Sequence, residues 1–248
     1  MRRRSLTVLL LFAFLGVWQL VASLPGVDDL LLASPVETAR ALGDDSSLLF
    51  HNVGVTLLEV LLGLAISVAV GAGAALAMHL ARPLRDAAYP LLIASQAIPI
   101  VVVAPLLVLA FDYGIGPKIA IVALVCFFPV TVNLLDGLRA TDAELLKLMR
   151  SLGASRAQTL WKVELPAALP YLFSGLRIAA TVSVIGAVFG EWAGAEEGLG
   201  RLVLLGTQQL ETARAYAGIV LLTLMALALF AAVTLAERAA VPWARKGA

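Results

Sequence analysis

The sequence is poor in charged residues and in the side chains from which metal and redox sites are built. Charged residues make up 14% of the 248-residue chain and hydrophobic residues 61%, whereas soluble domains carry about 25% charged residues. The single cysteine, Cys126, excludes an internal disulfide, and His51 and His79 have no ligand partner at useful spacing, so no metal site is expected. The net charge of +1 argues against nucleic-acid binding. A lipid bilayer is the predicted solvent.

The motifs of several enzyme classes are absent as well. The sequence contains no Gly-x4-Gly-Lys-Ser/Thr phosphate loop, no His-Glu-x-x-His and no Gly-x-Ser-x-Gly. Its apolar segments hold no Ser/His or Asp/Asp pair that would support hydrolysis. We therefore expect no catalytic residue and no cofactor in this chain, and ATP bound through a phosphate loop must belong to another polypeptide.

Long apolar segments are the dominant feature that is present. A transmembrane helix needs about 20 predominantly apolar residues. The six candidate segments are Leu6–Leu24, Val53–Met78, Tyr89–Phe111, Ile119–Leu135, Tyr171–Phe189 and Tyr216–Ala236. The first is longer than the apolar region of a typical signal peptide and lacks a clear cleavage site, which favours a retained anchor. The predicted fold class is an all-α integral membrane protein with six transmembrane helices.

The distribution of Lys and Arg predicts the orientation of these helices. If the N-terminus is inside, only four of the eighteen Lys and Arg residues lie outside, namely Arg40, Lys118, Arg201 and Arg214. Positive charge accumulates on the cytoplasmic side of membrane proteins. Both termini, and the polar segment 141–170, are therefore predicted to be cytoplasmic.

This polar segment predicts two short helices joined by a turn. Thr141 and Glu144 have the spacing of a capping box at the start of the first helix. Gly153 lies where a left-handed residue would end that helix. Ser155 is expected to cap the second helix, and Pro166, which lacks an N–H, is expected to stop it.

The same segment has more apolar side chains than a solvated loop needs. Its predicted docking face for a partner consists of Leu148, Met149, Leu152, Leu160 and Trp161.

The spacing of this segment resembles a known loop. Gly153, nine residues, Val163, any residue and then Leu165-Pro166 is similar to the cytoplasmic "EAA" loop of permease subunits of bacterial binding-protein-dependent ABC importers. Where that family often has Glu-Ala-Ala, this chain has Lys147-Leu148-Met149. The departure affects the salt contacts made there and leaves the helix–glycine–helix geometry unchanged.

The resemblance covers most of the chain, from Val53 to Ala236, and implies the type I ABC importer permease fold. It implies an N-terminal helix and outer amphipathic segment (1–52), a transmembrane domain (53–236) with a coupling loop (136–170), and a cytoplasmic tail (237–248). The residues that would dock on or couple to an ATPase are Glu144, Leu148, Met149, Leu152, Gly153, Leu160, Trp161, Val163, Leu165 and Pro166.

The resemblance also implies partners and location. These are a second permease copy, two cytoplasmic ATPase subunits that bind ATP-Mg, and an extracytoplasmic solute-binding protein. The chain would be a multi-pass protein of the bacterial inner membrane. Its task would be to form the translocation path for a small solute.

Polar and helix-breaking residues inside spans indicate where that path would lie. Ser95, Gln96 and Pro99 are the candidates in the third span, and Pro99 and Pro105 together are expected to bend it. Glu59 is a further candidate, since a charge near mid-bilayer costs about 2.5–3.5 kcal/mol on insertion scales. Glu191, after the fifth span, is a candidate for an outer gate or for a contact with a solute-binding protein. Structural contacts and helix packing remain an open alternative for each of these residues.

Two segments bear on the solute. Ala33–Thr38 resembles the Pro-Ser-Pro segment of permeases for nitrate, sulfonate, taurine and pyrimidine precursors. Gly190–Trp192, followed by Gly198–Gly200, resembles importers of pyrimidine or flavin-type vitamin precursors, which gives a slight preference for such a solute. The alternative function is a self-sufficient secondary transporter or channel, although the internal repeats and paired charges common in those proteins are not visible here.

Overall fold

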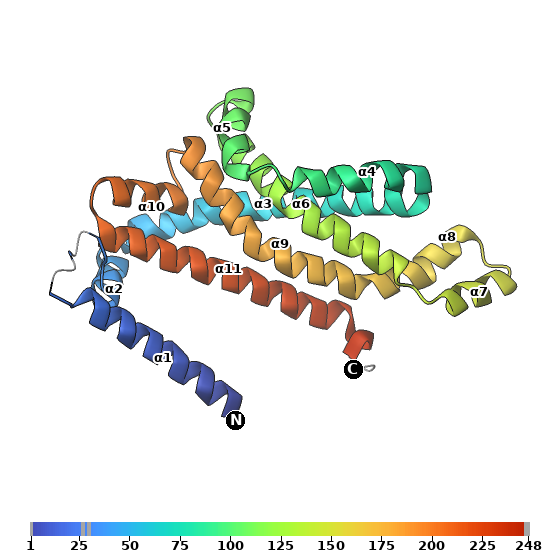
Figure 1. The fold of residues 1–248 in the computed structure, drawn as a ribbon, viewed down its shortest axis with the longest axis horizontal. Helices are drawn as coiled ribbons and strands as arrows, with labels where there is room; N and C mark the ends of the chain where they lie inside the picture. Colours follow the sequence, from blue (N-terminus) through green and yellow to red (C-terminus); the bar gives the residue numbers. More distant parts are fainter. Residues whose placement is uncertain (1, 26–27, 29–30, 246–248) are drawn as a thin grey trace. The chain divides into compact units, whose positions relative to one another are not determined.

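The computed structural model describes residues 2–25, 28 and 31–245, and this part of the chain is helical and contains no strand (Figure 1). The elements are α1 (Arg2–Ala22), α2 (Pro35–Asp44), α3 (Ser46–Leu80), α4 (Arg82–Ser95), α5 (Ile100–Phe111), α6 (Ile115–Arg139), α7 (Ala143–Ser151), α8 (Arg156–Thr159), a π-helical turn (Leu160–Glu164), α9 (Leu165–Gly194), α10 (Leu199–Gln208), α11 (Thr212–Ala240) and a final 3-10 turn (Pro242–Arg245). The chain divides into two compact units. The first comprises Met1–Thr56 and Ala195–Leu224, and the second Leu57–Gly194 and Met225–Ala248.

Four helical stretches are long and apolar enough to cross a membrane: α3, α6, the continuous stretch Arg156–Gly194, and α11. The pair α4 and α5 makes a fifth if it is one span. The apolar part of α1, Leu6–Ala22, is shorter than the roughly 20 residues that a transmembrane helix needs. The all-α membrane fold is thus confirmed, whereas six spans and cytoplasmic termini remain predictions.

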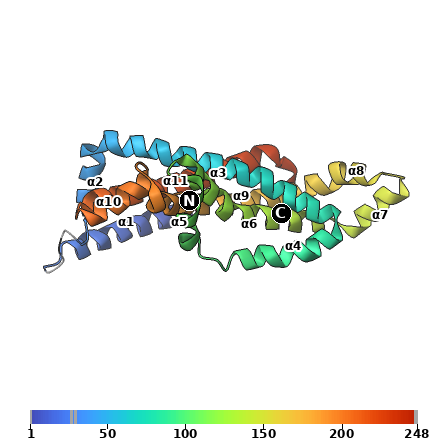
Figure 2. The same cartoon turned by 90° about the horizontal axis from the view of Figure 1, so that it is seen from above.

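The bend predicted in the third span is confirmed, and it is a complete break. Helix α4 ends at Ser95, α5 begins at Ile100, and the two helices differ in direction by 100° (Figure 2). Pro99 precedes α5 in an extended conformation (φ −65°, ψ 122°). Proline cannot donate an N–H and disfavours helix in the residue before it, so the break falls here. Pro105 lies within α5 without interrupting it.

The second unit is built on α6 and α9, which lie side by side (Figures 1 and 2). Their backbones approach closely at Gly175, where an added Cβ would lie 2.5 Å from the carbonyl oxygen of Pro129. Further along, an added Cβ on Gly190 would lie 3.1 Å from the Cα of Lys118. Hydrocarbon gives apolar side chains little reason to associate, so close packing at small residues holds helices together in membranes.

The first unit includes an aromatic contact between distant parts of the sequence. The indole of Trp18 on α1 donates a hydrogen bond to the carbonyl oxygen of Ala33 at 3.0 Å. Its ring lies 5.6 Å from that of Tyr216 on α11, centroid to centroid. This indole therefore links α1 to the start of α2 and to α11.

The Gly175 contact gives a test of the α6–α9 packing. Gly175→Ala should destabilise the protein by about 1–3 kcal/mol, because the methyl group meets a backbone oxygen that cannot move aside. Thermal unfolding in detergent measures the effect. Gly73→Ala on α3 is the matched control, since nothing lies within 4 Å of its added Cβ and alanine favours the helix. Equal stabilities for the two variants would contradict the close contact.

Candidate functional site

The first helix of the polar segment 141–170, α7, is capped one residue later than predicted. The carboxylate of Asp142 accepts a hydrogen bond from the backbone N–H of Glu144 at 2.8 Å. The Thr141 hydroxyl instead donates to the carbonyl oxygen of Leu138 at 3.4 Å. The predicted Thr141–Glu144 capping box is therefore wrong, because the neighbouring aspartate is an equally good acceptor for the free N–H groups.

The turn predicted at Gly153 is confirmed. Gly153 has φ +72°, in the left-handed region that glycine occupies without steric cost. Its N–H bonds to the carbonyl oxygen of Arg150 at 3.0 Å, and the N–H of Ala154 bonds to that of Met149 at 3.0 Å. This pair of hydrogen bonds is the Schellman motif, which satisfies the last carbonyl groups of α7.

The predicted cap of the second helix is also confirmed. The hydroxyl of Ser155 accepts from the N–H of Gln158, and the Gln158 side chain accepts from the N–H of Ser155, at 3.2 and 2.8 Å. This capping box holds both ends of the first turn of α8.

The predicted role of Pro166 as a helix stop is wrong. The chain passes from α8 through the π-helical turn into α9, of which Pro166 is the second residue. In the π turn the N–H of Leu165 bonds to the carbonyl oxygen of Leu160. This wider turn accommodates a residue without an N–H, so the helix continues into the membrane span.

Leu160 does not belong to the docking face. It is only 8% exposed and packs in a cluster with Ala75, Met78, Leu134, Leu135, Leu138 and Ala168. Leu165 packs against the same cluster. Both residues were predicted to dock on or couple to an ATPase. In the structure they attach the segment to the ends of α3 and α6.

Two polar contacts complete this attachment. Nε2 of His79, near the end of α3, lies 2.9 Å from Oε2 of Glu164 in the π turn. A guanidinium nitrogen of Arg156 donates to the carbonyl oxygen of Leu80 at 3.2 Å. Helix α8 and the π turn are therefore fixed to α3.

Large apolar side chains remain exposed beyond these anchors. Leu148, Leu152 and Trp161 are 52%, 72% and 70% exposed, and Met149 is half-buried. Figure 1 shows α7 and α8 extending past the end of the α6–α9 pair. We call the stretch from Asp142 to Glu164 the elbow. Its first arm is α7, before Gly153, and its second arm is α8 with the π turn, after Gly153. It presents an apolar surface on a rigid support.

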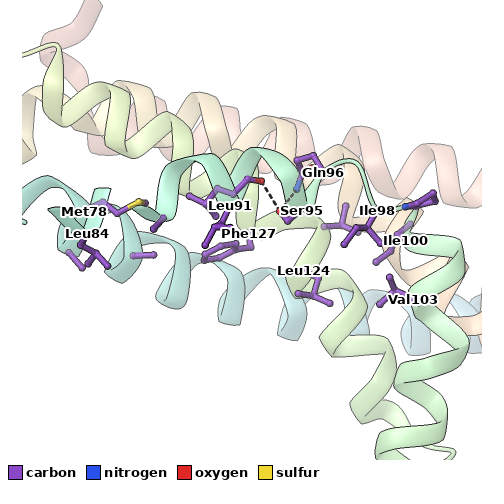
Figure 3. Close-up of a pocket in the computed structure, with 16 residues that line it drawn as sticks. Met78, Leu84, Leu91, Ser95, Gln96, Ile98, Ile100, Val103, Leu124 and Phe127 are labelled. Carbon is purple, nitrogen blue, oxygen red and sulfur yellow. Dashed lines mark hydrogen bonds between the residues drawn. The ribbon is translucent and has the colours of Figure 1, made fainter. Parts of the chain in front are cut away.

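A cavity of about 790 Å³ lies beside the break between α4 and α5 (Figure 3). Ser95, Gln96 and Pro99, predicted for the solute path, all line it. The hydroxyl of Ser95 donates to the carbonyl oxygen of Leu92 at 2.7 Å, and the Gln96 amide donates to Ser95 at 3.4 Å. The described residues that line the cavity are otherwise apolar, and none is charged.

The other two path candidates lie elsewhere. Glu59 and Glu191 are buried, at 1% and 0% exposure, and neither lines this cavity. Nζ of Lys118 lies 3.4 Å from Oε1 of Glu59, and Glu191 interacts with the same carboxylate. These three residues join α3, α6 and α9 in the second unit. A path role for the two glutamates remains a prediction.

Sequence reasoning missed Lys118, which it assigned to an outer loop. Lys118 lies in the first turn of α6 and is only 8% exposed. A cation is unfavourable at a helix N-terminus because the helix dipole is positive there. A lysine at the start of an apolar helix was therefore the feature of the sequence that could have indicated a nearby carboxylate.

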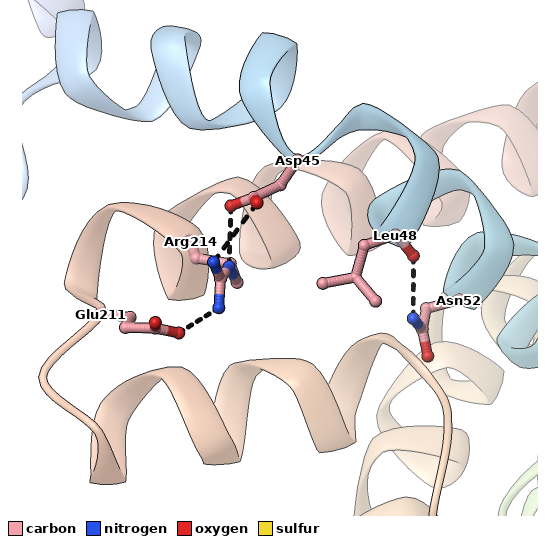
Figure 4. A network of polar contacts seen from close by, with 5 residues as sticks. All are labelled: Asp45, Leu48, Asn52, Glu211 and Arg214. Atoms are coloured by element: carbon pink, nitrogen blue, oxygen red, sulfur yellow. Dashed lines mark hydrogen bonds and ion pairs between the residues drawn. The ribbon is translucent and has the colours of Figure 1, made fainter.

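Polar side chains of the first unit accept hydrogen bonds from the backbone N–H groups at the start of α10. The amide oxygen of Asn52 accepts from the N–H of Gly198 at 2.5 Å, and the Thr56 hydroxyl accepts from that of Leu199 at 2.9 Å. Asn52 also donates to the carbonyl oxygen of Leu48 at 2.8 Å (Figure 4). The free N–H groups of the helix terminus are thereby paired.

An ion-pair network lies beside these bonds. The guanidinium of Arg214 donates to both carboxylate oxygens of Asp45, at 2.7 and 3.3 Å, and to Glu211 (Figure 4). It connects the end of α2 with the start of α11. A bidentate pair of this kind fixes geometry as well as charge.

One solved transporter has a closely similar fold. The chain matches the structure entitled "Inward facing conformations of the MetNI methionine ABC transporter: CY5 native crystal form" with a TM-score of 0.68 and 21% identity, over 79% of this chain and 97% of the other. At this identity the likeness establishes the fold alone.

Two relatives are similar in sequence over nearly the whole chain. The formylaminopyrimidine transport permease protein ThiX of Halalkalibacterium halodurans is 38% identical over 231 residues, 93% of this chain and 92% of the relative. The riboflavin transport system permease protein RibX of Chloroflexus aurantiacus is 36% identical over 239 residues, 96% and 88%. Residues 67–246 match the family described as "Binding-protein-dependent transport system inner membrane component". The chain therefore belongs to this family and is a multi-pass inner-membrane permease subunit of an ABC importer.

Proposed function

We propose that the elbow couples this permease to a separate ATPase subunit that binds ATP-Mg. The observation that carries the proposal is the exposure of Leu148, Leu152 and Trp161. The segment that bears them is held in place by the hydrogen bonds of the Gly153 turn and by the contacts with α3. An exposed apolar surface in water is unfavourable unless a partner covers it.

The connections of the elbow explain how movement would reach the membrane. Helix α8 continues through the π turn into α9, so displacement of the second arm passes directly into a membrane span. The bond between His79 and Glu164 passes it to α3 as well. ATP-driven closure of the ATPase pair would thus move rigid spans and alternate access to the solute path.

We further propose that two copies of the chain form the path and that an extracytoplasmic binding protein delivers the solute. In this family a single six-span chain provides half of a pathway and one elbow. The second copy would supply the other half and a second elbow for the second ATPase subunit.

We propose a neutral nitrogen heterocycle of the vitamin-precursor type as the solute. The cavity offers Ser95 and Gln96 as hydrogen-bonding groups within an apolar wall, which suits a planar polar ring. A sulfonate such as taurine carries charge that this lining does not balance. The names of the formylaminopyrimidine and riboflavin relatives support the same class.

Gly153→Asp tests coupling. The variant should insert normally and keep ATP hydrolysis in the assembled importer, but transport should fall about tenfold, because a left-handed non-glycine residue costs about 1–2 kcal/mol. Solute uptake and ATPase activity are measured in proteoliposomes with the ATPase and binding protein of the importer. Ala157→Asp, which adds the same charge on exposed α8, is the control. Normal transport by Gly153→Asp would show that the turn is not the coupling element.

Trp161→Ser tests docking. Loss of this 70% exposed ring should weaken binding of the ATPase subunit by tenfold or more, since buried aromatic anchors contribute about 2 kcal/mol or more to interfaces. Co-purification from detergent reports the affinity. Tyr113→Ser removes an 80% exposed ring away from the elbow and should leave binding unchanged. An unaltered yield of ATPase with Trp161→Ser would exclude this face as the docking site.

Gln96→Leu tests the solute class. The variant should raise the KM for uptake of formylaminopyrimidine by about tenfold, since one hydrogen bond to a buried ligand group is lost. Uptake is compared with that of taurine, which the wild-type importer should not transport. Thr234→Val on α11, whose hydroxyl bonds within its own helix at 2.8 Å, is the control. Transport of taurine in preference to the heterocycle would overturn this assignment.

A further inference from the structure

A second cavity, of about 690 Å³, lies in the second unit where the α3–α4 turn meets the elbow. Its lining is strongly basic. Five arginines contribute to it: Arg82, Arg85, Arg139, Arg150 and Arg156. They come from α4, α6, α7 and α8, which are separate along the sequence. The fold therefore gathers positive charge at this point.

The described residues do not balance this charge. Glu164 is the single carboxylate in the lining, and it is bonded to His79. Arg85 is paired with Asp86 at 2.9 Å, outside the lining. Arg156 donates to a backbone carbonyl group, which carries no formal charge.

The three remaining arginines, Arg82, Arg139 and Arg150, make no ion pair with a described carboxylate and are exposed. Several guanidinium groups held around one cavity repel one another unless an anion lies between them. A guanidinium matches the geometry of phosphate oxygens, to which it donates two parallel hydrogen bonds.

We propose that this cavity binds a phosphate-bearing anion. The shared chemistry is a phosphate group held by guanidinium groups, and its source is either the headgroup of an anionic membrane lipid or free phosphate. The arginines belong to segments predicted to face the cytoplasm, where basic pockets between helices bind lipid headgroups.

The position of the cavity indicates what a bound anion would do. Arg82 begins α4, which lines the solute cavity, and Arg150 and Arg156 belong to the elbow. An anion bound by these groups would bridge the two arms of the elbow to the solute-lining helix. Its binding should therefore stabilise the elbow in its anchored position.

The test uses the full-length permease in nanodiscs. One arm compares neutral phosphatidylcholine with a mixture that contains phosphatidylglycerol, and a second adds inorganic phosphate to the neutral discs. Thermal unfolding reports stabilisation, and native mass spectrometry reports retained lipid. Arg82→Gln/Arg150→Gln should weaken binding of the anion about 25-fold, since each arginine near a phosphate contributes roughly fivefold.

The matched control is Lys147→Gln/Lys162→Gln, which removes two positive charges from the elbow without altering the lining of the cavity. Stabilisation by phosphatidylglycerol that the arginine variant alone loses identifies a lipid site, and the same pattern with inorganic phosphate identifies a soluble anion. Equal loss in both variants would mean general surface attraction and overturn the proposal. Co-purification with the ATPase subunit is measured for the same variants. If the arginine variant keeps a normal anion response but no longer binds the ATPase, these arginines belong to the ATPase contact and the proposal is overturned.

Discussion

The close contact between α6 and α9 is the constraint on which the rest of the second unit depends. Both arms of the elbow continue from these helices, since α7 follows α6 and α8 runs into α9. Their separation is fixed by glycines such as Gly175, whose missing side chain lets backbone meet backbone. The elbow begins after the end of α6 and ends at the start of α9, so the separation of these helices fixes the distance between its two ends. The elbow is therefore as rigid as this contact.

The bilayer imposes a second constraint, which is that polar groups within the helices must find partners in the protein. Asn52 and Thr56 meet this requirement by accepting from the start of α10. Lys118 and Glu59 meet it by pairing across α6 and α3. In each case a residue that is unfavourable for its own segment is compensated by a residue distant in sequence. These buried polar side chains thus mark tertiary contacts.

This distinction explains which features the sequence predicts. The long apolar helices α3, α6, α9 and α11, the turn at Gly153 and the cap at Ser155 depend on residues within a few positions of one another, and all of these are recovered. The burial of Leu160 and the site of Lys118 depend on helices far apart in the sequence, which spacing does not reveal. The continuation of the helix through Pro166 is a local feature that was also missed, because it needs a π turn that no simple residue pattern specifies.

The positions of the two cavities bear on how solute and ATP events communicate. The apolar cavity and the basic cavity are both lined by α4, the first near its end at Ser95 and the second at its start at Arg82. The proline break after α4 separates it from α5, so no continuous helix connects the two halves of this span. Helix α4 thus shares one cavity with the elbow at its start and lines the proposed solute cavity at its end. On the proposed function, coupling would need no longer route than the length of α4.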